Sequence, residues 1–303
     1  MHYPYEGSGK AVRMSRLSGA GNGRYLMVRT ADEGGASASA PVPGAGGGSG
    51  TGGRAGVAGS AVSPSVSAPA LDVDGFLLAA HAAVDAGADA LIVPKGRTRL
   101  LAPDLFGRCA LVVHLSSGLP YDAHADARQV LVGGVTDALR LGADAVSVHV
   151  NFGSDGELAQ LRDAAAVAEE CRDWSMPLLV AAHARGPRIA DPRSVETLSR
   201  VVTIAADLGA DLVATSLPVP LYRMVEVVAN SPVPVIAAGT PVGGVDLPGF
   251  ARAVLATSCA GLAVDARALA GPLVGQAVRE LAGVVHDPFI PDRPRLRHLV
   301  SVS

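Results

Sequence analysis

Gly87-Ala88-Asp89-Ala90-Leu91-Ile92-Val93-Pro94-Lys95 joins a glycine that ends a helix to a short apolar strand. The same Gly-Ala-Asp junction recurs at 142–144 and 209–211, each time before another apolar run, and Ala260-Gly261 is a weaker fourth copy. Each glycine follows a stretch with helical spacing, where a left-handed glycine ends a helix without a steric penalty. Each run after the junction is short and apolar, as expected of a strand buried on both faces. The repeat therefore predicts alternating helices and parallel strands.

Four further strand-like runs complete the pattern, at residues 24–30, 110–115, 177–182 and 234–238. Eight strands, each followed by a helix-length segment, over roughly 250 residues are typical of a closed (β/α)8 barrel. A doubly wound open sheet is the competing architecture, but no Gly-x-Gly-x-x-Gly follows the first strand. We therefore predict an α/β protein with a single-domain TIM barrel.

Composition divides the chain into three parts. Residues 1–22 are expected to be a loose leader, residues 23–286 the barrel, and residues 287–303, with three prolines, an extended tail. Residues 35–70 consist almost wholly of Gly, Ala, Ser, Pro and Val and carry one charge, Arg54, so they predict a flexible insertion after the first strand. This insertion is either a mobile lid over the site or tolerated filler.

The charge and the composition of the chain argue against several classes of function. The net charge of −3 and the pI near 6.2 give no sign of a nucleic-acid partner. No apolar run approaches the roughly 18 residues that span a bilayer, so we expect no membrane partner and a cytoplasmic protein. Cys109, Cys171 and Cys259 lack metal-ligand spacing, and neither a metal nor another cofactor is predicted. Lysine occurs only at Lys10 and Lys95.

The candidate site lies where the predicted strands end, because the carboxyl ends of barrel strands form the catalytic face. Asp32 is either a site carboxylate or part of a solvated acidic turn. Lys95 is an amine nucleophile, an anion binder or a surface charge. His114 and His149 alternate with apolar neighbours, so they point into the barrel as site residues or as satisfied core histidines. The full set of candidates is Asp32, Glu33, Lys95, His114, Ser116, His149, Asn151, His183, Arg185, Ser216, Gly239 and Asp265.

Two of these candidates and one further pair of residues carry a specific expectation. His183 can act as a general acid or base near neutral pH. Asp265, after the last strand, opposes a tightly held phosphate at a place where many barrels bind one. Ser154-Asp155 is expected to cap the helix that follows the fourth strand.

Several segments resemble the archaeal-type class I fructose-bisphosphate aldolases, a family that includes 2-amino-3,7-dideoxy-threo-hept-6-ulosonate synthase and the 3-amino-4-hydroxybenzoate pathway aldolases. The resemblance covers about residues 14–286, and its most specific part is the fourth-strand run. The segments are Gly142-Ala-Asp-Ala-Val-Ser-Val-His149-Val-Asn151-Phe-Gly-Ser-Asp155, Val113-His114-Leu-Ser116-Ser-Gly118, Lys95-Gly96-x-x-Arg99 and Met14-Ser-Arg16-Leu17.

The chain departs from that family at the residues expected to react. The resemblance implies an Asp-His-Gly motif, and Asp32 matches it but is followed by Glu33. It implies a tyrosine where His183 stands and a Schiff-base lysine where Ala214 stands. It also implies a phosphate-binding Gly-Arg after the last strand, where this chain has Asp265-Ala266-Arg267. Because alanine cannot form an imine, the usual covalent route is closed.

We therefore predict a repurposed aldolase-family enzyme that acts on a small, non-phosphorylated carbonyl substrate of a biosynthetic side pathway. Asp32 and His183 would perform acid–base catalysis in an aldol or retro-aldol step, a cyclisation or a dehydration. In a variant of this hypothesis, Lys95 supplies the imine. The alternative is a catalytically inactive barrel that serves as a ligand-binding or partner scaffold. The resemblance also implies a homo-oligomer.

Overall fold

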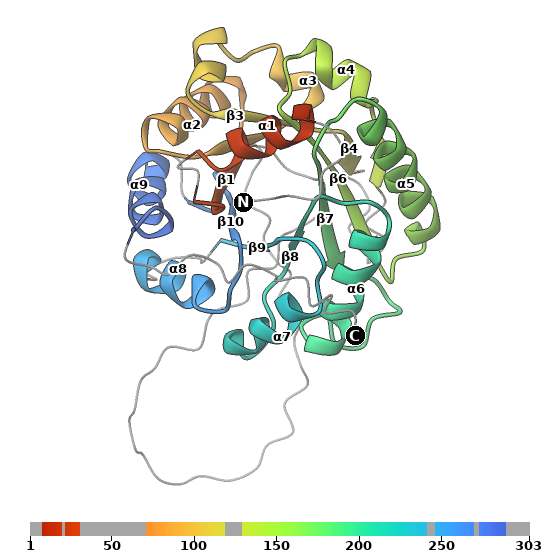
Figure 1. Ribbon diagram of the computed structural model, residues 1–303. Helices are drawn as coiled ribbons and strands as arrows, with labels where there is room; N and C mark the ends of the chain where they lie inside the picture. Colours follow the sequence, from red (N-terminus) through yellow and green to blue (C-terminus); the bar gives the residue numbers. More distant parts are fainter. Residues whose placement is uncertain are drawn as a thin grey trace, which may run out of the picture.

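The computed structural model describes residues 8–19, 22–30, 71–118, 129–240, 246–269 and 273–288. Strands and helices alternate through most of these ranges (Figure 1). The strands are β1 (Tyr25–Arg29), β2 (Ala90–Pro94), β3 (Ala110–His114), β4 (Ser116–Gly118), β5 (Gln129–Leu131), β6 (Ala145–Phe152), β7 (Leu178–Ala184), β8 (Leu212–Thr215), β9 (Val235–Ala238) and β10 (Gly261–Asp265). The helices are α1 (Ser8–Leu17), α2 (Val73–Asp85), α3 (Lys95–Thr98), α4 (Val135–Arg140), α5 (Glu157–Asp173), α6 (Val195–Asp207), α7 (Met224–Ala229), α8 (Leu247–Leu255) and α9 (Val274–Val285), with short 3₁₀ turns at Pro103–Gly107 and Leu221–Arg223.

The eight predicted strands form a closed parallel barrel in the order β1-β10-β9-β8-β7-β6-β3-β2. Strand β1 pairs in parallel with both β10 and β2, which closes the ring and rules out an open sheet. The helices surround the strands (Figure 1). The predicted (β/α)8 TIM barrel is confirmed. A small antiparallel pair of strands, β4 and β5, was not predicted from the sequence.

The barrel strands bury both of their faces, in two separate hydrophobic clusters. Residues such as Met27, Val112 and Leu179 point inward and pack together inside the barrel. Their chain neighbours, such as Val28 and Val113, point outward and pack against the helices. This period of two explains the continuous apolar runs of the sequence, and it fixes which side chains reach the barrel mouth.

The Gly-Ala-Asp junctions have a specific structural role. Gly87, Gly142 and Gly209 adopt positive φ angles of 95°, 82° and 105°, which only glycine adopts readily. Each aspartate then accepts a hydrogen bond from a backbone N–H of the preceding barrel strand. The three bonds join Leu26 N to Asp89 Oδ2 (2.7 Å), Leu111 N to Asp144 Oδ2 (3.0 Å) and Leu178 N to Asp211 Oδ2 (2.9 Å). The repeated aspartate therefore ties neighbouring strands together at the amino-terminal end of the barrel.

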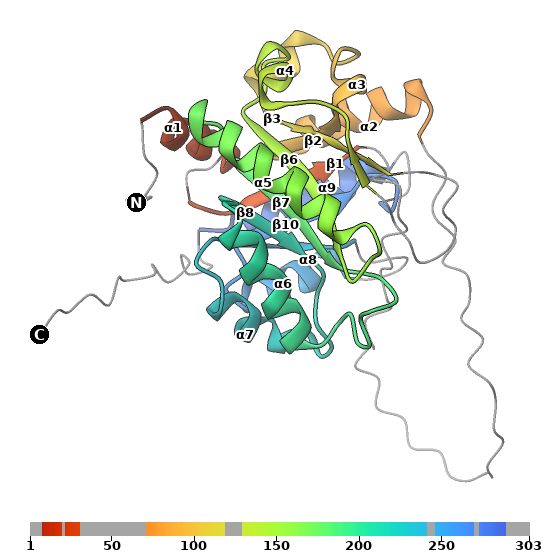
Figure 2. The same cartoon turned by 90° about the vertical axis from the view of Figure 1, so that its right-hand side faces the viewer.

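The expectation of a loose leader is wrong for residues 8–17, which form α1. This helix lies at one end of the barrel (Figure 2), where Met14 and Leu17 are fully buried. Its basic side chains reach the junction aspartates, since Lys10 pairs with Asp211 at 3.0 Å and Arg16 with Asp144 at 2.6 Å. The helix is held by these side chains as well as by its apolar face, a combination that composition alone does not reveal.

Two predicted segments lie wholly or largely outside the described residues. The insertion at 35–70 lies outside the described residues, as do residues 289–303 of the predicted tail. Within the described ranges, no helix combines the length and the apolar character needed to cross a membrane.

Candidate functional site

Two histidines meet at the carboxyl end of the barrel. His149 on β6 and His183 on β7 have ring centroids 4.8 Å apart, with the ring planes inclined by 34°. Asn151 and His183 are partners in the strand register and share the inward face. His149 points inward, as its alternation with apolar neighbours predicted, and its ring contacts that of His183.

Asn151 orients the His149 ring. The Asn151 side chain is fully buried, and its Oδ1 lies 2.9 Å from His149 Nε2. An amide oxygen only accepts hydrogen bonds, so this contact assigns the proton of the neutral imidazole to Nε2. The backbone of the same histidine is held as well, because His149 N donates to Ser116 Oγ at 3.0 Å. Asn151 and Ser116, both predicted site residues, therefore hold the ring and the backbone of His149.

His183 is the more accessible ring of the pair. It is half-buried, and its Nδ1 lies 3.2 Å from Ser216 Oγ, just beyond the end of β8. His114 lies one layer deeper, because its register partner is Ser147, which precedes His149 by two residues on the same face. His114 Nδ1 lies 2.8 Å from Ser147 Oγ, and the ring is almost fully buried.

The two positions that decide imine chemistry are Ala214 and Lys95. Ala214 is buried inside the barrel on β8, beside Ala181 of β7. Lys95 follows Pro94, the last residue of β2, and opens α3. Its Nζ pairs with Asp137 Oδ2 of α4 at 3.4 Å. The structure thus turns Lys95 toward an outer helix and does not bring it into contact with His149 or His183.

Asp265 lies on the other side of the mouth, at the end of β10. Its carboxylate accepts from Arg267 Nη2 at 2.8 Å, from Arg267 Nε at 3.2 Å and from the Arg267 backbone N at 2.9 Å. Both side chains are more than nine-tenths buried. The expectation that Asp265 repels a phosphate as a lone negative charge is therefore incomplete, because the pair with Arg267 is neutral.

Arg29 is a further site candidate, absent from the set predicted from the sequence. This residue ends β1, is largely buried and is the register partner of Asp265. Its inward direction follows from the alternation with Tyr25 and Met27, both of which lie in the interior cluster. That alternation was readable in the sequence.

The remaining predicted residues are only partly tested. Asp32 and Glu33 lie outside the described residues. Arg185 is half-buried after β7, and its backbone N donates to Phe152 O at 2.8 Å. Gly239 follows β9 with a φ of 151°. In the part of the chain that the structure describes, no group of three or more His, Cys, Asp or Glu side chains is placed to hold a metal ion.

Comparison with known proteins assigns this barrel to a family. Residues 71–279 match the model of the DeoC/LacD family aldolases. This chain belongs to that family. The resemblance stated from the strand motifs is confirmed.

Two relatives of this aldolase-family chain are synthases. It is 39% identical over 201 residues to 2-amino-4,5-dihydroxy-6-oxo-7-(phosphonooxy)heptanoate synthase of Streptomyces griseus, an alignment that covers 66% of this chain and 73% of the relative. It is 32% identical over 208 residues to 2-amino-3,7-dideoxy-D-threo-hept-6-ulosonate synthase of Halobacterium salinarum, which covers 68% and 77%.

Solved aldolase structures share the fold of this family member. A Schiff-base-forming fructose-1,6-bisphosphate aldolase aligns with a TM-score of 0.62 at 24% identity, over 70% of this chain and 84% of that one. The fructose-bisphosphate aldolase of Slackia heliotrinireducens aligns with a TM-score of 0.69 at 16% identity, over 92% and 86%. At these identities the likeness concerns the barrel alone.

Proposed function

We propose that this aldolase-family chain is an enzyme that performs carbonyl chemistry by general acid–base catalysis, with His149 and His183 as the reacting pair. The observation that carries the proposal is the contact of the two imidazoles at the barrel mouth, 4.8 Å apart, on the strand ends where barrel enzymes place their catalytic groups. Buried alanine at position 214 supports it, because that side chain cannot form an imine.

The placement of the two lysines also favours an acid–base route. Lys10 lies at the amino-terminal end of the barrel, where it pairs with Asp211. Lys95 pairs with Asp137 of α4. An imine at Lys95 would require its side chain to leave that partner and cross the rim. The Lys95 variant of the hypothesis therefore becomes one outcome of the test.

The two rings can divide the acid and base roles between them. The neutral ring can take a proton from the carbon next to a carbonyl, and the protonated ring can give one to the carbonyl oxygen. The resulting enediol attacks an aldehyde carbon in the aldol direction. Asp32 stays a predicted partner in this step.

The substrate that we propose lacks a phosphate at the Asp265 side of the mouth. Arg267 donates three hydrogen bonds to Asp265, and releasing it to bind a phosphate would break a buried pair, at a cost of about 3–5 kcal/mol. The Streptomyces griseus relative is named for a product with an oxo group, hydroxyls and a phosphonooxy group. We propose that this chain keeps the oxo and hydroxyl chemistry and takes a substrate without the phosphate.

The proposal is tested with dihydroxyacetone and glyceraldehyde, two unphosphorylated carbonyl probes, and the wild type, His183→Gln and Lys95→Met. We expect the wild type and Lys95→Met to form the condensed sugar at similar rates and His183→Gln to be at least about 100-fold slower, the lower end of a general acid–base contribution. Borohydride treatment with dihydroxyacetone should add no mass to the wild type. A trapped adduct on Lys95 would establish the imine route instead, and turnover that does not depend on His183 would favour the scaffold.

A further inference from the structure

The two loops that follow the histidine strands meet backbone to backbone. Gly153 follows β6 with a φ of 85°, and Gly186 follows β7 with a φ of 151°. A Cβ on Gly186 would lie only 2.2 Å from the carbonyl carbon and oxygen of Gly153, so the approach requires glycine at position 186. Any displacement of one loop is therefore transmitted to the other.

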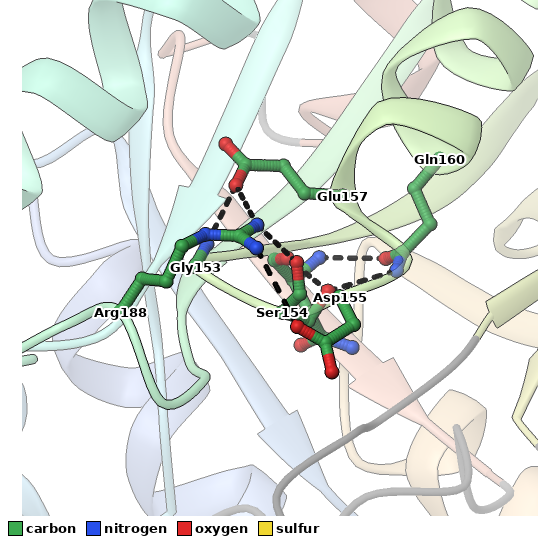
Figure 3. Close-up of polar contacts among 7 residues, drawn as sticks. Gly153, Ser154, Asp155, Glu157, Gln160 and Arg188 are labelled. Carbon is green, nitrogen blue, oxygen red and sulfur yellow. Dashed lines mark hydrogen bonds and ion pairs between the residues drawn. The ribbon is translucent and has the colours of Figure 1, made fainter.

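Arg188 fastens this junction with its guanidinium group (Figure 3). Its Nη2 donates to Glu157 Oε2 at 2.8 Å and also to the backbone oxygen of Ser154, while Nη1 lies 3.5 Å from Asp155 Oδ1. Glu157 Oε2 in turn accepts from Gly153 N at 3.1 Å. One side chain from the loop after β7 thus holds two groups of the loop after β6 and the carboxylate of the first residue of α5.

Gln160 supports the same loop from the helix beneath it. Its Oε1 accepts from Asn151 N at 2.8 Å, and its Nε2 donates to Ser154 Oγ at 3.2 Å (Figure 3). Ser154 Oγ donates to Asn151 O at 2.8 Å. This arrangement corrects the expectation that Ser154 caps α5: the cap position is Gly156, and the serine hydroxyl is used inside the loop. Gln160 is 3% exposed, and Asn151 and Ser154 are fully buried.

We propose that Arg188 and Gln160 are positioning residues, which set the contact between His149 and His183 through Ser154 and Asn151. Gln160 and Ser154 fix both backbone groups of Asn151, whose side chain fixes the proton of His149 on Nε2. Arg188 fixes the β7 loop, and hence His183, against the same serine. The consequence for turnover rests on the proposed function, whereas the consequence for ring geometry does not.

The test compares Arg188→Ala and Gln160→Leu with the full-length wild type. Arg162→Ala is the matched control, because Arg162 is an exposed arginine on α5. The first measurement is by NMR: the Overhauser effect between the ring protons of His149 and His183, and the ring nitrogen shifts that report the tautomer of His149. We expect Arg188→Ala to weaken the ring–ring effect at least twofold, Gln160→Leu to mix the His149 tautomers, and the control to match the wild type.

Two further variants separate positioning from loss of fold. Arg188→Lys keeps the positive charge but loses the two-nitrogen fork that spans Ser154 and Asp155, so its ring–ring effect should lie between the wild type and Arg188→Ala. Gln160→Glu keeps the acceptor for Asn151 N and should retain more of the wild-type tautomer than Gln160→Leu. Thermal unfolding of every variant shows that the barrel is intact at the temperature of the NMR measurement.

The outcomes distinguish this inference from the proposed function. If ring geometry and tautomer are the same in Arg188→Ala, Gln160→Leu and the control, the positioning role is refuted. If they change as expected and kcat with the dihydroxyacetone probe falls about tenfold at a similar KM, both proposals are supported. If they change while kcat does not, the positioning role stands and the proposed function is refuted.

Discussion

Replacing Asp89 with asparagine should remove a large pH dependence of stability. Asp89 is almost fully buried, and desolvation raises its pKa from 3.8 to about 7, against the lowering effect of the backbone hydrogen bonds from Leu26 and Gly19. Because the folded state binds this proton more tightly than the unfolded state, the stability contribution is fully present below pH 3.8 and is lost as the pH rises to about 7. Between pH 5 and pH 8 the loss amounts to about 3 kcal/mol.

Asparagine at position 89 keeps the hydrogen bond to the backbone but has no carboxyl group that titrates. Its side-chain oxygen can still accept from Leu26 N, and it carries no charge to desolvate. Urea unfolding of the wild type and of Asp89→Asn should therefore give similar free energies of unfolding at pH 5. At pH 8 the free energy of unfolding of the wild type should be lower than that of Asp89→Asn by about 3 kcal/mol. His286, whose Nε2 lies 3.3 Å from Asp89 Oδ1, has a pKa lowered by desolvation and by Arg24. Because this contact couples the two titrations, the comparison of aspartate with asparagine at position 89 is made in a His286→Gln background.

The control for this measurement is Asp85→Asn, since Asp85 is exposed and pairs with Arg108 at the surface. Its stability difference from the wild type should stay constant between pH 5 and pH 8. A difference between the wild type and Asp89→Asn that is equally flat would refute the assignment of Asp89 as a carboxyl that is costly to ionise in its burial site.

Three other predictions follow from single contacts. Ala214→Lys should introduce a borohydride-trappable amine for dihydroxyacetone, because position 214 faces the barrel interior below Ser216; an untouched lysine there would show that the position does not reach the site. Asp265→Asn should free Arg267 to bind inorganic phosphate, as measured by calorimetry, and should lower the free energy of unfolding by about 3–5 kcal/mol. Phosphate binding equal to that of the wild type would contradict the proposal that Asp265 keeps Arg267 from binding phosphate. Lys10→Met should lower the unfolding free energy by about 3 kcal/mol, since it leaves a buried carboxylate without its cation; a change under about 1 kcal/mol in urea unfolding would show that α1 is held by its apolar face alone.

The barrel was predictable because its signal is local and repeated. Each Gly-Ala-Asp junction marks the end of a helix and the start of a strand, and the alternation along β6 already pointed His149 inward. The same alternation also indicates the direction of Lys95. Ala90, Ile92 and Pro94 share one parity, so the next residue faces away from the interior even before α3 turns the chain.

Other features depend on contacts that no local pattern specifies. The ring contact of His149 with His183 requires the register of β6 against β7, which is set by the whole barrel. Ser154 follows the pattern of a helix cap, but Gln160 from the first turn of α5 binds its hydroxyl. The ion pair of Asp265 with Arg267 depends on a turn whose geometry is visible only in three dimensions.

Proton exchange at the carbon next to a carbonyl tests the central claim most directly. Dihydroxyacetone is incubated with the enzyme in deuterium oxide, and the loss of its carbon-bound protons is followed by NMR. We predict exchange catalysed by the wild type and by Lys95→Met, and at least about 100-fold slower exchange with His183→Gln. Exchange that survives in His183→Gln, or that disappears in Lys95→Met, would contradict acid–base catalysis by the histidine pair.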